Sequence, residues 1–292
     1  MDEAVLALYG ARVARYLEAR GVAFRILPLP TTEENKSLEL VTRVLEEVHA
    51  FGVDRRAEPI LAIGGGVCLD VAGLATLLYR RQTPYMRVPT TLLAYVDASM
   101  ALMKHRGLFE LLEAEGPNML SSSFQSPDRV GAEEPADAAM ESTRVAIETV
   151  LEELAPNLRE DDLDRLVDFG QLISPELEIT VLPALLHGEA VTIDMSFMLF
   201  VARVRGLLTA QQQQQRVLGC MRGLELPVHH AACSLGLVRQ ALAGRLKHSV
   251  GSLRMPLPTG LGRAEIFHDI SDETLCEAYS KWSQELSAPE DG

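Results

Sequence analysis

Three consecutive glycines, Gly64, Gly65 and Gly66, form the stretch of this sequence best suited to hold an anion. The apolar run at 59–63 before them is typical of a buried strand, and a helical pattern follows from Val67. A strand, a glycine turn and a helix N-terminus together present free backbone N–H groups to an anion. Glycine lets the backbone approach a pyrophosphate closely. A glycine turn of this kind also occurs for structural reasons alone.

The elements around this turn alternate between helix and strand. Apolar residues recur at helical spacing in 4–17 and 36–51, whereas 23–28 and 85–88 are typical of strands. This alternation predicts an open parallel sheet. Further helices are expected at 140–154, 184–208, 211–223 and 231–246, with a Ser/Pro/Gly-rich loop over 117–135. The fold class is therefore α/β: a Rossmann-like parallel sheet domain over residues 1–100, then a mostly α-helical domain over 101–292.

Composition excludes several classes of function. The 292 residues carry a net charge of −14, which argues against nucleic acid or an anionic membrane as a partner. No apolar run is long enough to span a bilayer, and the acidic, amphipathic N-terminus does not read as a signal peptide. The four cysteines show no disulfide or metal spacing, which favours a cytoplasmic protein with free thiols.

A longer stretch is more specific than the glycines. GGGVxxDxxG over 64–73, YRR at 79–81 and VPTTLLxxVDAS over 88–99 resemble the dehydroquinate synthase-like sugar phosphate cyclases. The pattern YRRxTPYxRVPTTL is similar to the branch that cyclises sedoheptulose 7-phosphate. That branch contains desmethyl-4-deoxygadusol and 2-epi-5-epi-valiolone synthases, and AYVDAS at 94–99 leans slightly toward the former.

The resemblance implies a lyase with NAD as an internal, recycled oxidant and a divalent metal, usually zinc. A hydroxyl of a phosphorylated sugar would be oxidised, phosphate lost, the ketone reduced, and the ring opened and closed again by an aldol step. Oxidation acidifies the neighbouring C–H, which is why phosphate can then leave. The resemblance also implies a homodimer and a place in mycosporine-type biosynthesis.

Site residues follow from the resemblance position by position. The residues expected to contact the dinucleotide are Glu33, Lys36, Gly65, Gly66, Val67, Asp70, Thr90 and Thr91. Arg81 and Asp97 are expected to bind the substrate, and Asp97 and His248 to take part in catalysis. Two structural alternatives stay open. Glu33 and Lys36 can belong to a solvated helix N-terminus, where acids favour the helix dipole. The two threonines can form a simple turn after Pro89.

The metal ligands are the weakest part of the resemblance. LLHGEAV over 185–191 makes His187 a metal ligand by resemblance, but the family's second histidine, in FGH, is replaced by Gln171. Glutamine is a weak neutral ligand compared with imidazole or carboxylate. The family's glutamate ligand lies in a block with no counterpart here. We therefore expect this site to bind metal weakly or not at all.

The chain departs from the family in two further places. After Ser99 the family's GxKxxVN motif and glutamate-bearing helix are missing, which predicts an internal deletion. The family's first strand, which ends in an Asp that Asp2 could match, has no counterpart before Asp2. Three readings remain: an active cyclase, a truncated relative that keeps partial nucleotide binding, and an iron-type alcohol dehydrogenase. HGEAV and PLPTGLG argue against the third.

Overall fold

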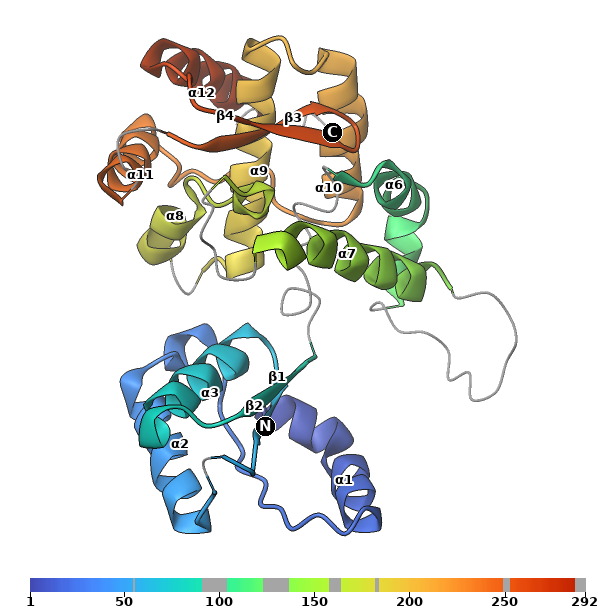
Figure 1. Ribbon diagram of the computed structural model, residues 1–292. Coiled ribbons are helices and arrows are strands. Elements are labelled where there is room, and N and C mark those ends of the chain that lie inside the picture. Colours follow the sequence, from blue (N-terminus) through green and yellow to red (C-terminus); the bar gives the residue numbers. More distant parts are fainter. Residues whose placement is uncertain are drawn as a thin grey trace. The chain divides into compact units, whose positions relative to one another are not determined.

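The structure is a computed structural model that describes residues 1–54, 56–90, 104–122, 137–157, 164–181, 184–248 and 253–286. The chain divides into two compact units, Met1–Val96 and Asp97–Gly292, each with its own core. The fold is α/β and mostly helical, with a small parallel sheet in the N-terminal unit (Figure 1). None of the described helices is both long enough and apolar enough to cross a bilayer.

The N-terminal unit contains the glycine turn. Its elements in chain order are α1 (Glu3–Ala19), a 3₁₀ turn (Glu33–Asn35), α2 (Leu38–Phe51), β1 (Ile60–Gly64), α3 (Gly66–Leu78), a second 3₁₀ turn (Tyr79–Arg81) and β2 (Tyr85–Pro89). Strands β1 and β2 pair in parallel, from Ile60 opposite Tyr85 to Gly64 opposite Pro89. The helix α3 that joins them packs on β1 and on α2 (Figure 1). This strand–helix–strand unit confirms the expected parallel sheet.

Local sequence explains where these helices begin and end. Asp2 caps α1 by accepting the N–H of Val5 at 2.9 Å, and Ser37 caps α2 by accepting the N–H of Leu40 at 3.3 Å. Gly52 ends α2 in the left-handed conformation, with φ at 82°. Such side-chain caps satisfy backbone donors that no helical carbonyl reaches.

The expected strand at 23–28 does not form. Among the described residues, the one β-bridge next to this segment is an isolated parallel bridge between Asp2 and Leu29. A strand exists only where a neighbour takes its backbone hydrogen bonds. In the described ranges no strand pairs with 23–28, so this apolar segment stays extended without forming a strand.

The C-terminal unit is built around one buried helix. Its helices are α6 (Arg106–Ser121), α7 (Ala138–Leu154), α8 (Ser174–Val181), α9 (His187–Val204), a π-helical segment (Gln211–Leu218), α10 (Gly219–Gly223), α11 (Leu235–His248) and α12 (Asp272–Leu286), with 3₁₀ turns at Ala155–Asn157 and Leu166–Asp168. Every residue of α9 from Ala190 to Ala202 is buried, and α8, α12 and β3 pack against it (Figure 1). Most of this buried stretch is apolar, as expected for a helix in such a central place, and three polar residues, Thr192, Asp194 and Ser196, are buried with it.

Two elements of this unit differ from the sequence expectations. An antiparallel hairpin of β3 (Met255–Gly260) and β4 (Arg263–Phe267) was not predicted, because its two prolines are unusual in a strand. Its pairing shifts between Pro258 and Gly260, which accommodates the irregularity. Helix α6 continues through Pro117 to Ser121, so the expected loop over 117–135 starts later; its residues 123–135 lie outside the described residues.

Candidate functional site

The glycine turn joins β1 to α3 and leaves the start of the helix open. Gly65 occupies the capping position, and no described side chain caps the first N–H groups of α3. A Cβ atom on Gly64 would lie 2.6 Å from Cβ of Cys68, so this glycine is required by internal packing. A Cβ atom on Gly66 would meet no described atom within 4 Å. The backbone at Gly66 is therefore accessible. The uncapped N–H groups in the first turn of α3 can bind an anion there.

Three residues predicted from distant parts of the sequence converge beside this turn. Lys36 Nζ lies 3.1 Å from Oδ2 of Asp70, on α3, and 3.5 Å from Oε1 of Glu33. Burial lowers the pKa of Lys36, but the hydrogen bond and charge of Asp70, followed by those of Glu33, outweigh it and raise the pKa overall. The ammonium therefore lies beside Asp70, about one turn into α3, in an ion-pair cluster that is about half exposed. The cluster places one donor and two acceptors within reach of one polar ligand.

The other predicted contacts of the turn are placed as follows. The side chain of Val67 is buried in the core, so it can offer a ligand only its backbone N–H. Thr90 donates its N–H to the carbonyl of Gly64 at 3.0 Å and leaves its side chain exposed. Thr91 and Asp97 lie outside the described residues. The second threonine and the substrate carboxylate therefore remain predictions.

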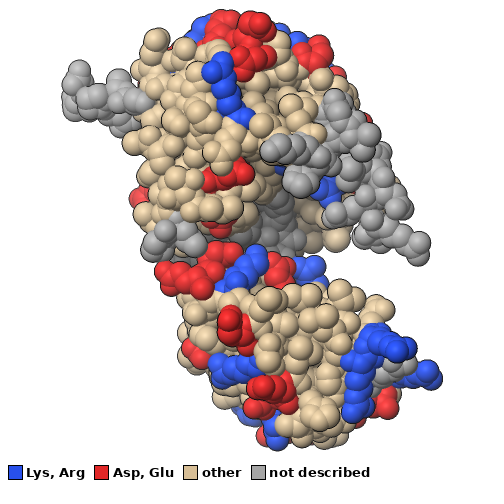
Figure 2. Space-filling view, turned by 90° about the vertical axis from the view of Figure 1, so that its left-hand side faces the viewer, with Lys and Arg blue, Asp and Glu red and all other residues tan. Residues whose placement is uncertain are grey.

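Arg81 lies in an unusual backbone segment after α3. Arg80, Arg81 and Gln82 have φ values of 47°, 65° and 87°, a region that costs residues other than glycine about 1 kcal/mol or more each. Figure 2 shows lysine and arginine side chains at several places on the surface of the N-terminal unit, interspersed with acidic ones. Arg56, Arg80 and Arg81 line an open hollow of about 570 Å³ together with Asp54. Strain of this kind is common at binding sites, and the exposed guanidinium of Arg81 suits a phosphate.

In the C-terminal unit, His187 is the first residue of α9. Its Nδ1 lies 2.9 Å from Oε2 of Glu178, on α8, and its ring is about one-third exposed. Sequence reasoning missed Glu178, because nothing in the sequence sets it apart from Glu176 two residues earlier. The fold alone directs it toward the start of α9.

The described residues do not fit a three-ligand zinc site. Within the described ranges, no three His, Cys, Asp or Glu side chains converge on one point. Gln171 stands where a second imidazole is expected, and its Oε1 accepts a hydrogen bond from Ser174 Oγ at 3.4 Å. The side chain of His248, at the end of α11, is outside the described residues. His187 and Glu178 are two donors, and structural or catalytic zinc takes at least three from the protein.

A buried carboxylate holds the loop that carries Gln171. Asp194, on α9, is fully buried; its Oδ2 accepts the N–H of Ile173 at 2.6 Å and of Ser174 at 2.9 Å. Its Oδ1 finds no partner among the described residues. Burial raises the pKa of Asp194 to about 6, although the backbone hydrogen bonds and the charge of Arg245 oppose the rise. Arg245 in turn donates to the carbonyl of Gln171.

Comparison with known proteins identifies the family. Residues 26–131 match the 3-dehydroquinate synthase N-terminal family and residues 98–248 the 3-dehydroquinate synthase C-terminal family. The chain belongs to the 3-dehydroquinate synthase family. A 2-epi-5-epi-valiolone synthase of Streptomyces hygroscopicus is 39% identical over 94% of this chain and 77% of that protein. A demethyl-4-deoxygadusol synthase of Trichormus variabilis is 29% identical over 95% of this chain and 79% of that protein.

Solved structures agree with this family assignment. The 2-epi-5-epi-valiolone synthase ValA of Streptomyces hygroscopicus, with NAD⁺ and Zn²⁺ bound, has a TM-score of 0.88 and 37% identity, covering 97% of this chain and 89% of that chain. A 2-deoxy-scyllo-inosose synthase, complexed with carbaglucose-6-phosphate, NAD⁺ and Co²⁺, shares the fold at a TM-score of 0.65 and 19% identity, covering 96% and 88% of the two chains.

The alignments also bear on the internal deletion. The alignment with the Streptomyces hygroscopicus enzyme runs over 324 positions, whereas the whole chain has 292 residues. The relative therefore contains residues that have no counterpart in this chain. This agrees with the prediction of a missing block, whose place after Ser99 remains a prediction.

Proposed function

We propose that this chain is a sugar phosphate cyclase that binds NAD at the glycine turn and converts sedoheptulose 7-phosphate with elimination of phosphate. The observation that carries the proposal is the convergence of Glu33, Lys36 and Asp70 at the uncapped start of α3. Asp70 lies more than thirty positions beyond the other two in the sequence, and the fold brings all three together. Relatives of the family named as valiolone and demethyl-4-deoxygadusol synthases supply the reaction class.

Each residue has a defined part in this proposal. The N–H groups of Gly66 and Val67 hold the pyrophosphate, and Lys36, Glu33 and Asp70 orient the rest of the dinucleotide. Bound NAD would supply the oxidant that takes a hydride from the carbon bearing a substrate hydroxyl, whose proton goes to a base, and would later return that hydride. Arg81 binds the substrate phosphate with its planar guanidinium, Thr90 and Thr91 offer hydroxyl groups, and Asp97 and His248 position the sugar and move its protons. By resemblance, the enzyme is a cytoplasmic homodimer.

The product is of the valiolone type in this proposal. Four relatives named 2-epi-5-epi-valiolone synthase are 35–39% identical to the chain, against 29% for the demethyl-4-deoxygadusol synthase. We give the sequence identity over most of the chain more weight than the single motif AYVDAS, which slightly favours a desmethyl-4-deoxygadusol synthase.

A second candidate is a relative that binds NAD without turnover. The observation in its favour is the donor set at His187, where Gln171 replaces a ligand and the described residues bring only Glu178 close. A zinc ion held by one imidazole and one carboxylate would dissociate readily. The two candidates therefore share the nucleotide site and differ at the metal.

The test is a titration of the full chain with NAD, followed by measurement of phosphate release from sedoheptulose 7-phosphate with added Zn²⁺ or Co²⁺. Lys36→Met is expected to raise the Kd for NAD about 10-fold, because it removes one charge-assisted contact. Arg43→Met, on the exposed face of α2, removes the same charge from the same unit and is expected to leave the Kd unchanged.

The outcomes separate the candidates. Weaker binding by the Lys36 variant together with phosphate release supports the cyclase. The same binding result with no phosphate released supports the relative without turnover. No NAD binding by the wild-type chain, or equal loss in the Lys36 and Arg43 variants, would overturn both.

A further inference from the structure

The imidazole ring of His187, at the start of α9, is held at one nitrogen and open at the other. Its Nδ1 lies 2.9 Å from Oε2 of Glu178, whereas no residue of the described ranges bonds to its Nε2. The side chain of His187 is 34% exposed and that of Glu178 16%, so a ligand reaches the ring more easily than the carboxylate. A Cβ atom on Gly188, the next residue, would meet no described atom within 4 Å, so the neighbouring backbone is open as well.

Helix α8 brings Glu178 to this position and holds it there. At the start of α8 the N–H of Ser174 donates to Oδ2 of the buried Asp194 at 2.9 Å, which ties α8 to α9. Leu177, the residue before Glu178, is fully buried in the core around α9. Because the backbones of both helices are fixed in this way, only the side chains of Glu178 and His187 can adjust, and their hydrogen bond determines how the ring is turned.

The same hydrogen bond determines which nitrogen of neutral His187 carries the proton. A carboxylate accepts hydrogen bonds and does not donate them, and a neutral imidazole has one N–H group and one lone pair. With Glu178 as the acceptor, the N–H group is at Nδ1 and the lone pair is at Nε2. The ring therefore presents a hydrogen-bond acceptor on the side away from Glu178.

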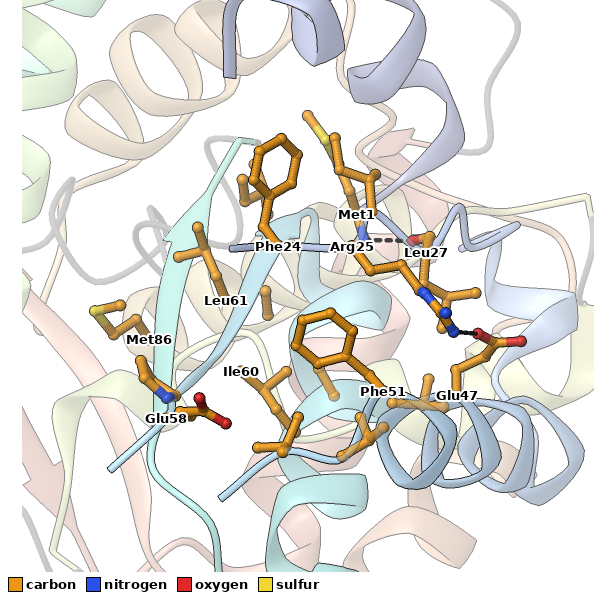
Figure 3. A pocket seen from close by; sticks show the side chains of 18 of the residues that line it. Met1, Phe24, Arg25, Leu27, Glu47, Phe51, Glu58, Ile60, Leu61 and Met86 are labelled. Carbon is orange, nitrogen blue, oxygen red and sulfur yellow. Dashed lines mark hydrogen bonds and ion pairs between the residues drawn. The ribbon is translucent and has the colours of Figure 1, made fainter. Parts of the chain in front are cut away.

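The apolar cavity of the N-terminal unit differs from this site, because the charged side chains that line it already have partners. Its volume is about 450 Å³, and most of its lining is apolar, as at Phe51 (Figure 3). Arg25 pairs with Glu47, with 3.1 Å between Nη1 and Oε2, and Glu58 accepts the N–H of Asp54 at 2.7 Å (Figure 3). A polar ligand therefore finds fewer open groups in this cavity than at the start of α9.

The donors around His187 favour a hydroxyl group over a metal ion as the partner of the lone pair at Nε2. Within the described ranges no three His, Cys, Asp or Glu side chains converge on one point, and the carboxylate of Glu178 is occupied by the N–H at Nδ1. A zinc ion takes at least three protein ligands, whereas a hydroxyl group needs a single acceptor. A sugar phosphate, the substrate in the proposed function, offers several hydroxyl groups.

We propose that Glu178 is a positioning residue, which holds neutral His187 with its proton on Nδ1 so that Nε2 accepts a hydrogen bond from a hydroxyl group of the bound sugar phosphate. The identity of this ligand rests on the proposed function, whereas the place of the proton does not. Glu176, two residues earlier on α8, provides a matched comparison, because its carboxylate accepts a hydrogen bond from Nε2 of Gln240, on α11, at 3.1 Å.

The first measurement is the tautomer of His187, by long-range nitrogen–proton correlation NMR on the full chain with isotope-labelled histidine at about pH 8, where neutral imidazole predominates. The chain has seven histidines, and a His187→Gln variant identifies the signals of His187. Wild type is expected to show the proton on Nδ1 alone. Glu178→Leu is expected to lose this single form and to give a mixture of the two tautomers. Glu176→Leu, which changes charge and size in the same way, is expected to keep the single form.

The second measurement is the Kd for sedoheptulose 7-phosphate, by calorimetric titration of the NAD-saturated chain with EDTA and, separately, with Zn²⁺. In EDTA, Glu178→Leu is expected to raise this Kd about 10-fold, because the lone pair at Nε2 is no longer held toward the ligand. Glu176→Leu is expected to leave the Kd unchanged. When the sugar phosphate is added to wild type, the NMR signal of Nε2 is expected to shift, as for a nitrogen that accepts a hydrogen bond.

The two measurements separate failure of this inference from failure of the proposed function. A proton on Nε2 of His187 in wild type, or equal loss of the Nδ1 form in the Glu176 variant, would overturn the role of Glu178. An unchanged Kd in Glu178→Leu, or binding that occurs only with Zn²⁺, would overturn the hydroxyl contact at Nε2. Absence of sedoheptulose 7-phosphate binding under both conditions would contradict the proposed function, and the tautomer of wild type would then still decide the role of Glu178.

Discussion

Replacement of Gly170 by alanine is expected to lower the free energy of unfolding by about 3 kcal/mol. Gly170 has a φ of +77°, a conformation that costs alanine about 1–2 kcal/mol. A Cβ atom there would lie 2.8 Å from Cγ of Met195 and 3.1 Å from the carbonyl oxygen of Val191, both on the buried helix α9. Because the core around α9 is closely packed, the neighbours cannot move away without further cost.

Gly188→Ala is the matched control. Gly188 lies in the first turn of α9, where an added Cβ atom meets no described atom within 4 Å, and alanine favours a helix more than glycine does. Urea unfolding followed by circular dichroism should give an unchanged or slightly higher midpoint for Gly188→Ala and a clearly lower one for Gly170→Ala. Similar urea midpoints for the two variants would show that the backbone at Gly170 is not packed tightly against α9.

The second large effect concerns pH. Because the pKa of Asp194 is raised from 3.8 to about 6 in the folded state, the folded protein holds this proton more tightly than the unfolded chain does. The stability that this gives is fully present below pH 4 and is lost as the pH rises through 6, by about 3 kcal/mol in total. An asparagine side chain at this position would resemble the protonated acid at every pH. The difference in unfolding free energy, wild type minus Asp194→Asn, should therefore fall by about 2 kcal/mol between pH 4.5 and pH 7.

Asp194→Ala provides the comparison. It removes the acceptor of the Ile173 and Ser174 N–H groups, and buried donors without partners cost about 1–3 kcal/mol at any pH. The free energy of unfolding of wild type, Asp194→Asn and Asp194→Ala is measured by denaturant unfolding at pH 4.5 and pH 7. If the free energies of unfolding of wild type and Asp194→Asn change in parallel with pH, the pKa of Asp194 is not raised. The charge of Arg245 would then keep the carboxylate ionised.

The sequence predicted the parts of the fold that depend on local patterns. The strand, glycine turn and helix at 60–78 formed as expected, since apolar spacing and glycines act over short distances. The family resemblance, and not the pattern itself, predicts that Glu33, Lys36 and Asp70 all contact the dinucleotide; the structure adds that their side chains form ion pairs with one another. Their role in binding a dinucleotide stays a prediction.

Other features depend on partners that a sequence pattern does not reveal. The segment 23–28 has the composition of a strand, but strand formation requires a neighbour on the sheet. Asp194 looks like any acid within an apolar run until the fold places the N-terminus of α8 against it. The same holds for Glu178, which reaches His187 only because α8 packs on the start of α9.

The cysteines give each unit its own internal reporter. Burial raises the pKa of Cys68 in the N-terminal unit, and it raises those of Cys220 and Cys233 in the C-terminal unit to about 11 and about 12. Since the thiolate is the reactive form, these three sulfurs are inert toward alkylating reagents while their unit stays closed. Cys276, on α12, is partly exposed. Modification of Cys68 therefore records opening of one unit, and modification of Cys220 and Cys233 records opening of the other.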